Sequence, residues 1–191
     1  MSLFEKAIIF AAEKHGGSVR KINSAPYILH PIEAALIASR ITLDDEVLAA
    51  VVLHDTVEDA GVSPDELLEL FGERVALLVA SETEDKRPGV PRNESWRTRK
   101  EESLEKLKNA SDPGVKILWL SDKLSNMRGL YRASREFGPR VLEHFNQRDP
   151  AQHEWYYRTA AKYMSGLEDT EPYREYVSLI EAVFGKEEKG S

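Results

Sequence analysis

Four residues with metal-binding or acid–base side chains end the most apolar stretch of this sequence, residues 47–59 (VLAAVVLHDTVED). His54 and Asp55 close the apolar run, and Glu58 and Asp59 follow. Residues four apart lie on one side of a helix, so a helical stretch would place His54 near Glu58 and Asp55 near Asp59. Charged groups beside a core are costly unless they are paired or bind a cation. We therefore interpret this stretch as part of a divalent metal site.

Two further residues of the same chemical kinds, His30 and Asp122, lie at the edges of other apolar segments. Each alone has an ordinary explanation: a histidine before a proline is usually a capping or core residue, and an aspartate on an apolar helix is usually a buried acceptor. Together with His54 and Asp55 they form a nitrogen and oxygen set that suits manganese, iron(II) or zinc better than calcium or copper(I). Adjacent helical residues point about 100° apart, so the spacing permits a shared ion without proving it.

The composition restricts the class of protein. The chain has 191 residues, of which 41% are hydrophobic and 31% charged, which suits one soluble domain with a real core. The net charge of -7 argues against general nucleic-acid binding but leaves room for a local basic pocket that binds a phosphorylated small molecule. The sequence contains no cysteine, which excludes disulfides and thiolate metal sites. The N-terminal segment resembles neither a membrane span nor a signal peptide, so we expect a cytoplasmic protein without a membrane partner.

Apolar residues recur at helical spacing along the whole chain, which predicts an all-α fold of about ten helices without strands. The expected helices cover residues 3–14, 31–40, 44–59, 64–71, 73–82, 96–109, 115–134, 139–145, 150–167 and 171–184. Residues 84–95 contain two prolines and are expected to form a loop, and a loop of this length in a compact domain is often functional. We interpret its basic residues Lys86, Arg87 and Arg92 as a solvated charge run, with neutralisation of phosphate as the alternative.

Three segments that contain these candidate residues resemble a known family. RKINSAPYILHP, VVLHDTVEDAGVSPDELLELFG and LSDKLSNMR are similar to segments of the HD-domain phosphohydrolases, specifically the (p)ppGpp hydrolase domain of RelA/SpoT proteins. They are most similar to the stand-alone small alarmone hydrolases of the metazoan SpoT-homologue type. The resemblance covers residues 4–132 with three motifs in order, which is more specific than any single match. Residues 133–184 resemble the small hydrolases only in general.

The resemblance implies a role for each matching position. In the family one Mn²⁺ ion is held by two histidines and two aspartates, which correspond here to His30, His54, Asp55 and Asp122. The acidic pair Glu58 and Asp59 would assist the attacking water. Arg20 and Lys21 would lie near the nucleotide, and Asn126 would contact the ribose. The resemblance also implies one HD hydrolase domain over residues 1–191, an HD-domain helical bundle that the C-terminal helices complete, with no room for a synthetase domain.

The chemistry of the residues themselves agrees with this implication. A bound divalent ion lowers the pKa of its water and screens phosphate oxygens, and a carboxylate one helical turn away could take the proton of that water. We therefore expect an Mn²⁺-dependent hydrolase that removes the 3′-pyrophosphate from (p)ppGpp or from its adenosine counterpart. One alternative is a metal-dependent phosphatase acting on another nucleotide such as NADPH. The other is a non-catalytic helical module that senses a nucleotide.

Several questions stay open at this level. The sequence does not decide between guanine and adenine, between a monomer and a homo-oligomer, or between Glu58 and Asp59 as the proton acceptor, and it does not identify the metal used in the cell. Three consecutive aromatic residues, Trp155, Tyr156 and Tyr157, could stack on a base. Aromatic residues at helical spacing more often belong to a core, and we interpret them so.

Overall fold

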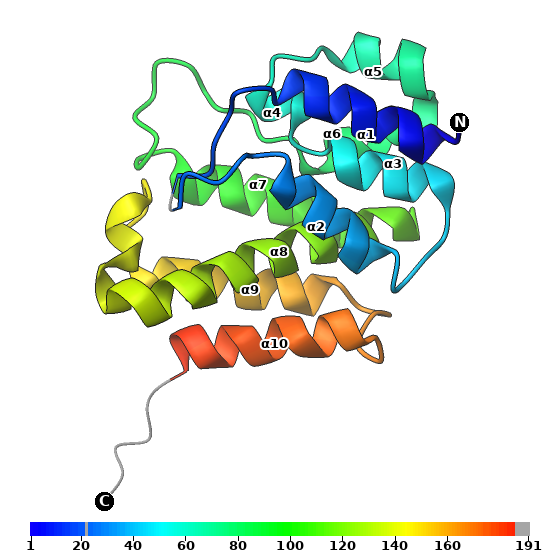
Figure 1. Ribbon diagram of the computed structural model, residues 1–191. Coiled ribbons are helices and arrows are strands. Elements are labelled where there is room, and N and C mark those ends of the chain that lie inside the picture. Colours follow the sequence, from blue (N-terminus) through cyan, green and yellow to red (C-terminus); the bar gives the residue numbers. More distant parts are fainter. Residues whose placement is uncertain (22, 186–191) are drawn as a thin grey trace, which may run out of the picture.

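The computed structural model describes residues 1–21 and 23–185, and its regular structure is helical (Figure 1). The one β feature within these residues is an isolated antiparallel bridge between Val19 and Pro26. The all-α prediction is confirmed. The elements in chain order are α1 (Leu3–Lys14), α2 (Leu29–Ala38), α3 (Asp45–Leu53), α4 (Thr56–Asp59), α5 (Pro64–Phe71), α6 (Glu73–Glu82), α7 (Trp96–Lys108), α8 (Pro113–Phe137), the 3₁₀ helix η1 (Gly138–His144), α9 (Pro150–Tyr163) and α10 (Glu171–Phe184).

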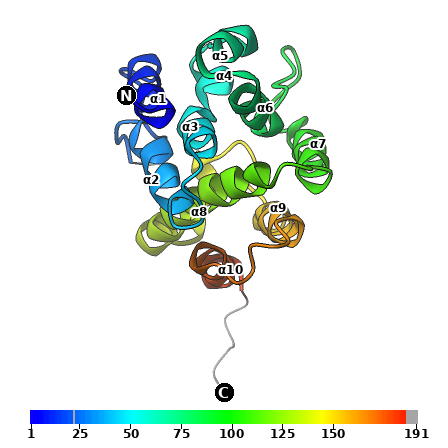
Figure 2. The same ribbon diagram turned by 90° about the vertical axis from the view of Figure 1, so that its right-hand side faces the viewer.

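Helix α8 is the centre of the bundle. The helices α2, α3, α6, α7, α9 and α10 all pack against it, and Figure 2 shows it surrounded by them. Its side chains Leu118, Trp119, Leu120, Leu124 and Met127 are completely buried. A helix that is apolar on several faces is expected to be buried on several faces. The same helix carries Asp122, so the core and the candidate site share one element.

The start of α8 is fixed by capping and by a close approach of helices. The carboxylate of Asp112 accepts a hydrogen bond from the backbone amide of Gly114 at 2.8 Å, and Pro113 occupies the first turn, where its missing amide hydrogen is not needed. A Cβ atom on Gly114 would lie 2.9 Å from a methyl carbon of Val47 on α3, so only glycine allows α8 to begin this close to α3. No helix in the described parts of the chain is both long and apolar enough to cross a membrane.

The predicted helix over residues 44–59 is divided into α3 and α4 by His54 and Asp55. The prediction of one continuous helix was wrong. At the break, the carbonyl group of Leu53 accepts a hydrogen bond from the hydroxyl group of Thr56 at 2.7 Å. A side-chain donor of this kind competes with the backbone amide that would continue the helix. The chain therefore changes direction at the His-Asp pair.

The bounds of α1, α5, α6 and α10 are as predicted, and the remaining boundaries differ from the prediction by a few residues. Helix α2 begins at Leu29, so His30 lies in its first turn, directly before Pro31. This is a position where proline is tolerated because the amide has no intrahelical partner. Helix α8 continues to Phe137, α9 already ends at Tyr163, and residues 84–95 form a loop as predicted.

The central position of α8 predicts that truncation of its buried side chains destabilises the whole protein. Leu118→Ala leaves a cavity beneath several helices, and we expect it to lower the free energy of unfolding by about 2–5 kcal/mol. Leu77→Ala is the control, because Leu77 is 62% exposed and its truncation should change that free energy by only about 0.5 kcal/mol or less. Urea denaturation measures both values. Equal effects of the two substitutions would contradict the central role of α8.

Candidate metal centre

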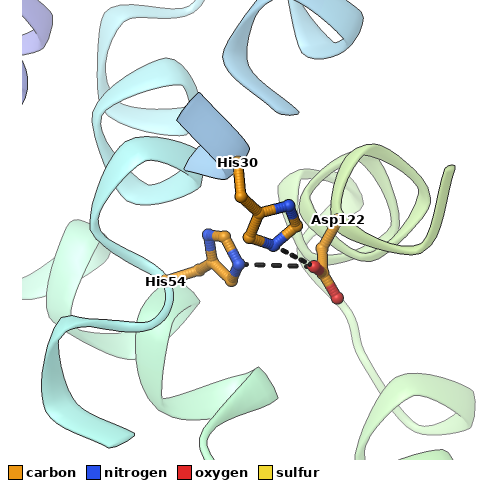
Figure 3. Close-up of side chains that lie close together, drawn as sticks. All are labelled: His30, His54 and Asp122. Carbon is orange, nitrogen blue, oxygen red and sulfur yellow. Dashed lines mark ion pairs between the residues drawn. The ribbon is translucent and has the colours of Figure 1, made fainter. Parts of the chain in front are cut away.

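The structure brings His30, His54 and Asp122 together from three separate elements (Figure 3). His30 comes from α2, His54 from the turn between α3 and α4, and Asp122 from α8. Nε2 of His30 lies 2.8 Å from Oδ1 of Asp122, and Nε2 of His54 lies 3.4 Å from the same oxygen. All three side chains are buried, and one potential ligand atom of each lies within 4.8 Å of the others. The geometry therefore suits a single small cation.

Asp55, the fourth expected ligand, lies beside this cluster. Its Oδ2 atom is 3.0 Å from Nε2 of His54 and 3.6 Å from Nε2 of His30. The same oxygen accepts a hydrogen bond from the hydroxyl group of Tyr27 at 2.6 Å. Asp55 is thus close enough to join a shared ion, and Tyr27 fixes the orientation of its carboxylate.

The hydrogen-bond network assigns the tautomer of His30. The hydroxyl group of Ser125 donates to Glu33 at 2.7 Å, so Ser125 must accept the hydrogen bond that it shares with Nδ1 of His30 at 2.8 Å. Nδ1 of His30 therefore carries a hydrogen, so in the neutral ring Nε2 presents a lone pair to Asp122. Glu33 in turn contacts Arg128 at 3.3 Å, and Arg128 forms a bidentate pair with Glu175 on α10 at 2.6 and 2.7 Å. Metal-bound histidines are typically oriented by a partner on the other ring nitrogen in this way.

His54 has the same tautomer for a different reason. Its Nδ1 atom lies 2.7 Å from the carbonyl oxygen of Val51, which can only accept. In the neutral ring Nε2 of His54 therefore has a lone pair as well, and this buried atom has no hydrogen-bond partner within the described residues. A lone pair that faces carboxylate oxygens is unfavourable unless a positive charge lies between them. The orphaned nitrogen and its two carboxylate neighbours therefore fit a divalent cation.

The pKa shifts of His54 and Asp122 also favour a positive charge at this site. Burial lowers the pKa of His54, but the charge of Asp55 and the contacts with Asp122 outweigh burial and raise that pKa well above its ordinary value. Burial raises the pKa of Asp122, but the charge of Lys123 and the two histidines outweigh it and hold that pKa well below its ordinary value. The cluster thus attracts positive charge, which a proton or a metal ion can supply.

The acidic pair on α4 occupies two different environments. Glu58 is half-buried and accepts a weak hydrogen bond from the backbone amide of Glu84 at 3.3 Å. Asp59 is exposed and pairs with Nζ of Lys86 at 2.6 Å, while its other oxygen lies 3.4 Å from the hydroxyl group of Tyr27. Burial, together with the charges of Asp55, Glu84 and Asp59, raises the pKa of Glu58. Lys86 is therefore not the solvated residue that the sequence suggested.

Of the three residues expected near the nucleotide, two are hydrogen-bonded to the cluster or to each other and one is exposed. Asn126 donates to Oδ1 of Asp122 at 2.7 Å and accepts from the guanidinium of Arg20 at 2.9 Å, so both are joined to the cluster. Lys21 is exposed, and the described residues give it no contact with the cluster.

The three consecutive aromatic residues belong to the core. Tyr156 is buried, and Trp155 and Tyr157 pack against the same core. The interpretation of these residues as core residues is confirmed.

Sequence reasoning missed several side chains that support the cluster, among them Tyr27, Ser125 and Lys123. Tyr27 and Ser125 lie in segments that were recognised, but nothing in a linear pattern shows which of their groups contacts a ligand. Lys123 directly follows Asp122 and contacts both its Oδ2 atom and Glu82. The signal that could have found it is a lysine among apolar residues, since a buried lysine requires a paired acid.

Comparison with known proteins gives consistent matches. The family described as HD domain matches residues 7–146. The human guanosine-3′,5′-bis(diphosphate) 3′-pyrophosphohydrolase MESH1 is 39% identical over 171 residues, which are 86% of this chain and 84% of that protein. An Aquifex aeolicus protein with the same enzyme name is 39% identical over 129 residues, 66% of this chain. This chain spans 18% of the Aquifex protein and 19% of a Myxococcus xanthus GTP pyrophosphokinase, so it corresponds to a small part of each.

Two solved structures have the same fold. The structure described as a metazoan orthologue of SpoT that hydrolyses ppGpp has a TM-score of 0.74 and 26% sequence identity, over 95% of this chain and 94% of that chain. A Listeria monocytogenes EGD-e protein has a TM-score of 0.70 and 30% identity, over 83% of this chain and 98% of that chain.

The assigned tautomer of His30 predicts that Ser125 supports cation binding. Ser125→Ala removes the group that holds Nδ1 of His30, and we expect divalent cation affinity to fall by about 10- to 100-fold. Ser121→Ala is the matched control, because Ser121 is also buried on α8 but donates only to the carbonyl of Ile117 in its own helix. Isothermal titration with Mn²⁺ measures both. Unchanged affinity in Ser125→Ala would contradict the assignment.

Proposed function

Because this chain belongs to the HD-domain family, within its RelA/SpoT-type hydrolases, we propose that it removes the 3′-pyrophosphate from a purine nucleotide alarmone. The observation that carries the proposal is the buried cluster in which the Nε2 atoms of two histidines face Asp122 beside an acidic pair. The human relative, of which this chain covers 84%, is named for this activity on guanosine 3′,5′-bis(diphosphate). We propose both the guanosine compound and its adenosine counterpart as substrates.

We propose that one Mn²⁺ ion is the cofactor and that His30, His54, Asp55 and Asp122 hold it. Two imidazole nitrogens and two carboxylates are a donor set that manganese accepts. When bound, such an ion lowers the pKa of a water molecule and screens phosphate charge. The residues fit this role because both Nδ1 atoms carry a hydrogen, so each Nε2 atom can bind a cation in place of a proton, and because their neighbours lower the pKa of both aspartates.

In this proposal Glu58 orients the attacking water and takes its proton. Its raised pKa suits a general base better than an ordinary glutamate does, because proton acceptors work best with a pKa near the working pH. Asp59 is less suited, since its charge is already neutralised by Lys86. Asp59 and Tyr27 would instead hold the surroundings of Asp55 in place.

The bond changes of the proposed reaction are those of a hydrolysis. The water oxygen forms a bond to the phosphorus next to the ribose, and the bond from that phosphorus to the 3′-oxygen breaks. The 3′-oxygen takes up a proton, and pyrophosphate leaves. Arg20 and Lys21 would neutralise phosphate charge, and Asn126, which already links Arg20 to Asp122, would contact the ribose.

We also propose that residues 1–191 act as one hydrolase domain in the cytoplasm. Helices α9 and α10 lie outside the matched segment 7–146, but α10 packs along α8, the helix that carries Asp122. This packing supports the proposal of a single domain. The proposed nucleotide substrate supports the cytoplasm as the compartment.

The direct test is incubation of the purified protein with ppGpp and with its adenosine counterpart, in Mn²⁺ and in EDTA. We expect pyrophosphate from at least one of them with Mn²⁺ and none with EDTA or with Asp122→Ala. NADPH is the comparison substrate and should give a lower kcat/KM. If neither alarmone released pyrophosphate, the proposed function would be wrong.

The role of Glu58 predicts a specific change in the pH profile. A base is active when deprotonated, so kcat/KM should rise as pH rises through the pKa of Glu58, and this acidic limb should lie above the ordinary glutamate value of 4.5. Glu58→Gln should abolish the limb and lower kcat by about 10²- to 10⁴-fold. Glu69→Gln, an exposed acid on α5, is the control and should behave as the wild type. A retained limb in Glu58→Gln would assign the proton to another group.

A further inference from the structure

A buried ion pair lies directly behind the candidate metal centre. Nζ of Lys123 lies 2.7 Å from Oε1 of Glu82 and also contacts Oδ2 of Asp122. Oδ1, the other oxygen of Asp122, faces the two histidines. Glu82, Lys123 and Asp122 are all less than 9% exposed. The mechanism above uses Asp122 but neither of its two charged neighbours.

The position of Glu82 is unfavourable for a carboxylate in two respects. It is a buried acid, and it is the last residue of α6, where the helix dipole disfavours a negative charge. Its Oε2 atom is buried without a hydrogen-bond partner. Burial accordingly raises the pKa of Glu82, although Lys123 opposes this effect. A residue that breaks local rules in this way is more often found at a functional site than elsewhere.

Lys123 has little freedom to move away from Asp122. Its ammonium lies 4.8 Å from the ring centre of Trp119 and 5.8 Å from that of Tyr156, and both rings are buried. The ammonium therefore stays between the two carboxylates, and Glu82 and Asp122 compete for its hydrogen bonds. Without Glu82, the whole positive charge of Lys123 would act on Asp122 and reduce the ability of that carboxylate to bind a cation.

We propose that Glu82 is a positioning residue for the metal centre, which acts by holding Lys123 and so leaves Asp122 available to the cation. The inference rests on the cation site of the proposed function but requires no particular substrate. It assigns a role to a residue that contacts neither the cation nor the nucleotide.

The test measures Mn²⁺ binding by isothermal titration without substrate. Glu82→Met keeps the length of the side chain but removes its acceptor, and it should weaken binding by about 10- to 100-fold. Glu82→Gln keeps an oxygen that can accept from Lys123 and should recover most of this loss. Glu46→Met is the matched control, because Glu46 also pairs with a basic side chain, that of Arg74. Glu46 lies at the end of α3 away from His54, and Arg74 keeps two other carboxylate partners when Glu46 is removed. Glu46→Met should bind Mn²⁺ as the wild type does.

A double-mutant cycle separates positioning from a general structural effect. If Glu82 acts through Lys123, Glu82→Met should cost no affinity in a protein that already carries Lys123→Met. The inference would be overturned if Glu82→Met lowered Mn²⁺ affinity equally with and without Lys123→Met, or if Glu82→Met bound Mn²⁺ as the wild type does. Hydrolysis by the wild type would be unaffected by either outcome, so the proposed function would stand. Failure of the wild type to bind Mn²⁺ at all would overturn both the inference and the proposed function.

Discussion

Two imidazole rings whose Nε2 atoms face one carboxylate in a buried space are the interaction on which the rest of this structure depends. Ser125 and the carbonyl of Val51 each accept the hydrogen of one Nδ1 atom, so Nε2 is the atom of each ring that faces Asp122. Between these atoms the cluster favours a positive charge, which a proton or a cation can supply. The folded core therefore holds three side chains in the positions that a cation site requires.

The architecture explains how ligands so distant in sequence converge. Helix α8 is buried on several faces, so α2 and α3 pack on it in fixed positions and bring His30 and His54 to Asp122. The break between α3 and α4 gives the chain a new direction after His54. As a result, the acidic pair of α4 lies beside the cluster and within reach of the loop that begins at Glu84. The packed core therefore holds the candidate ligands in place, and the irregular turn between α3 and α4 places the acidic pair beside them.

Much of this arrangement follows from the sequence, and the exceptions have physical causes. The bounds of α1, α5 and α10 were predictable because a capping side chain and apolar spacing agree there. The expected ligands His30, His54 and Asp122 do meet, since each lies at the edge of an apolar element that must join one core. The helix break was not predictable, because apolar periodicity continues through it and only the hydroxyl of Thr56 marks the interruption. The pairing of Glu82 with Lys123 was equally hidden, as it depends on how α6 and α8 pack and not on any local pattern.

The bidentate pair between Arg128 and Glu175 has a consequence for how much of the chain the candidate metal centre needs. Through Glu33 and Ser125, this pair continues to the ring of His30, so α10 is linked to that ring by a series of hydrogen bonds. Truncation before α10 would therefore remove one end of the network that orients His30. A fragment that preserves this orientation has to extend beyond residue 146, where the family match ends.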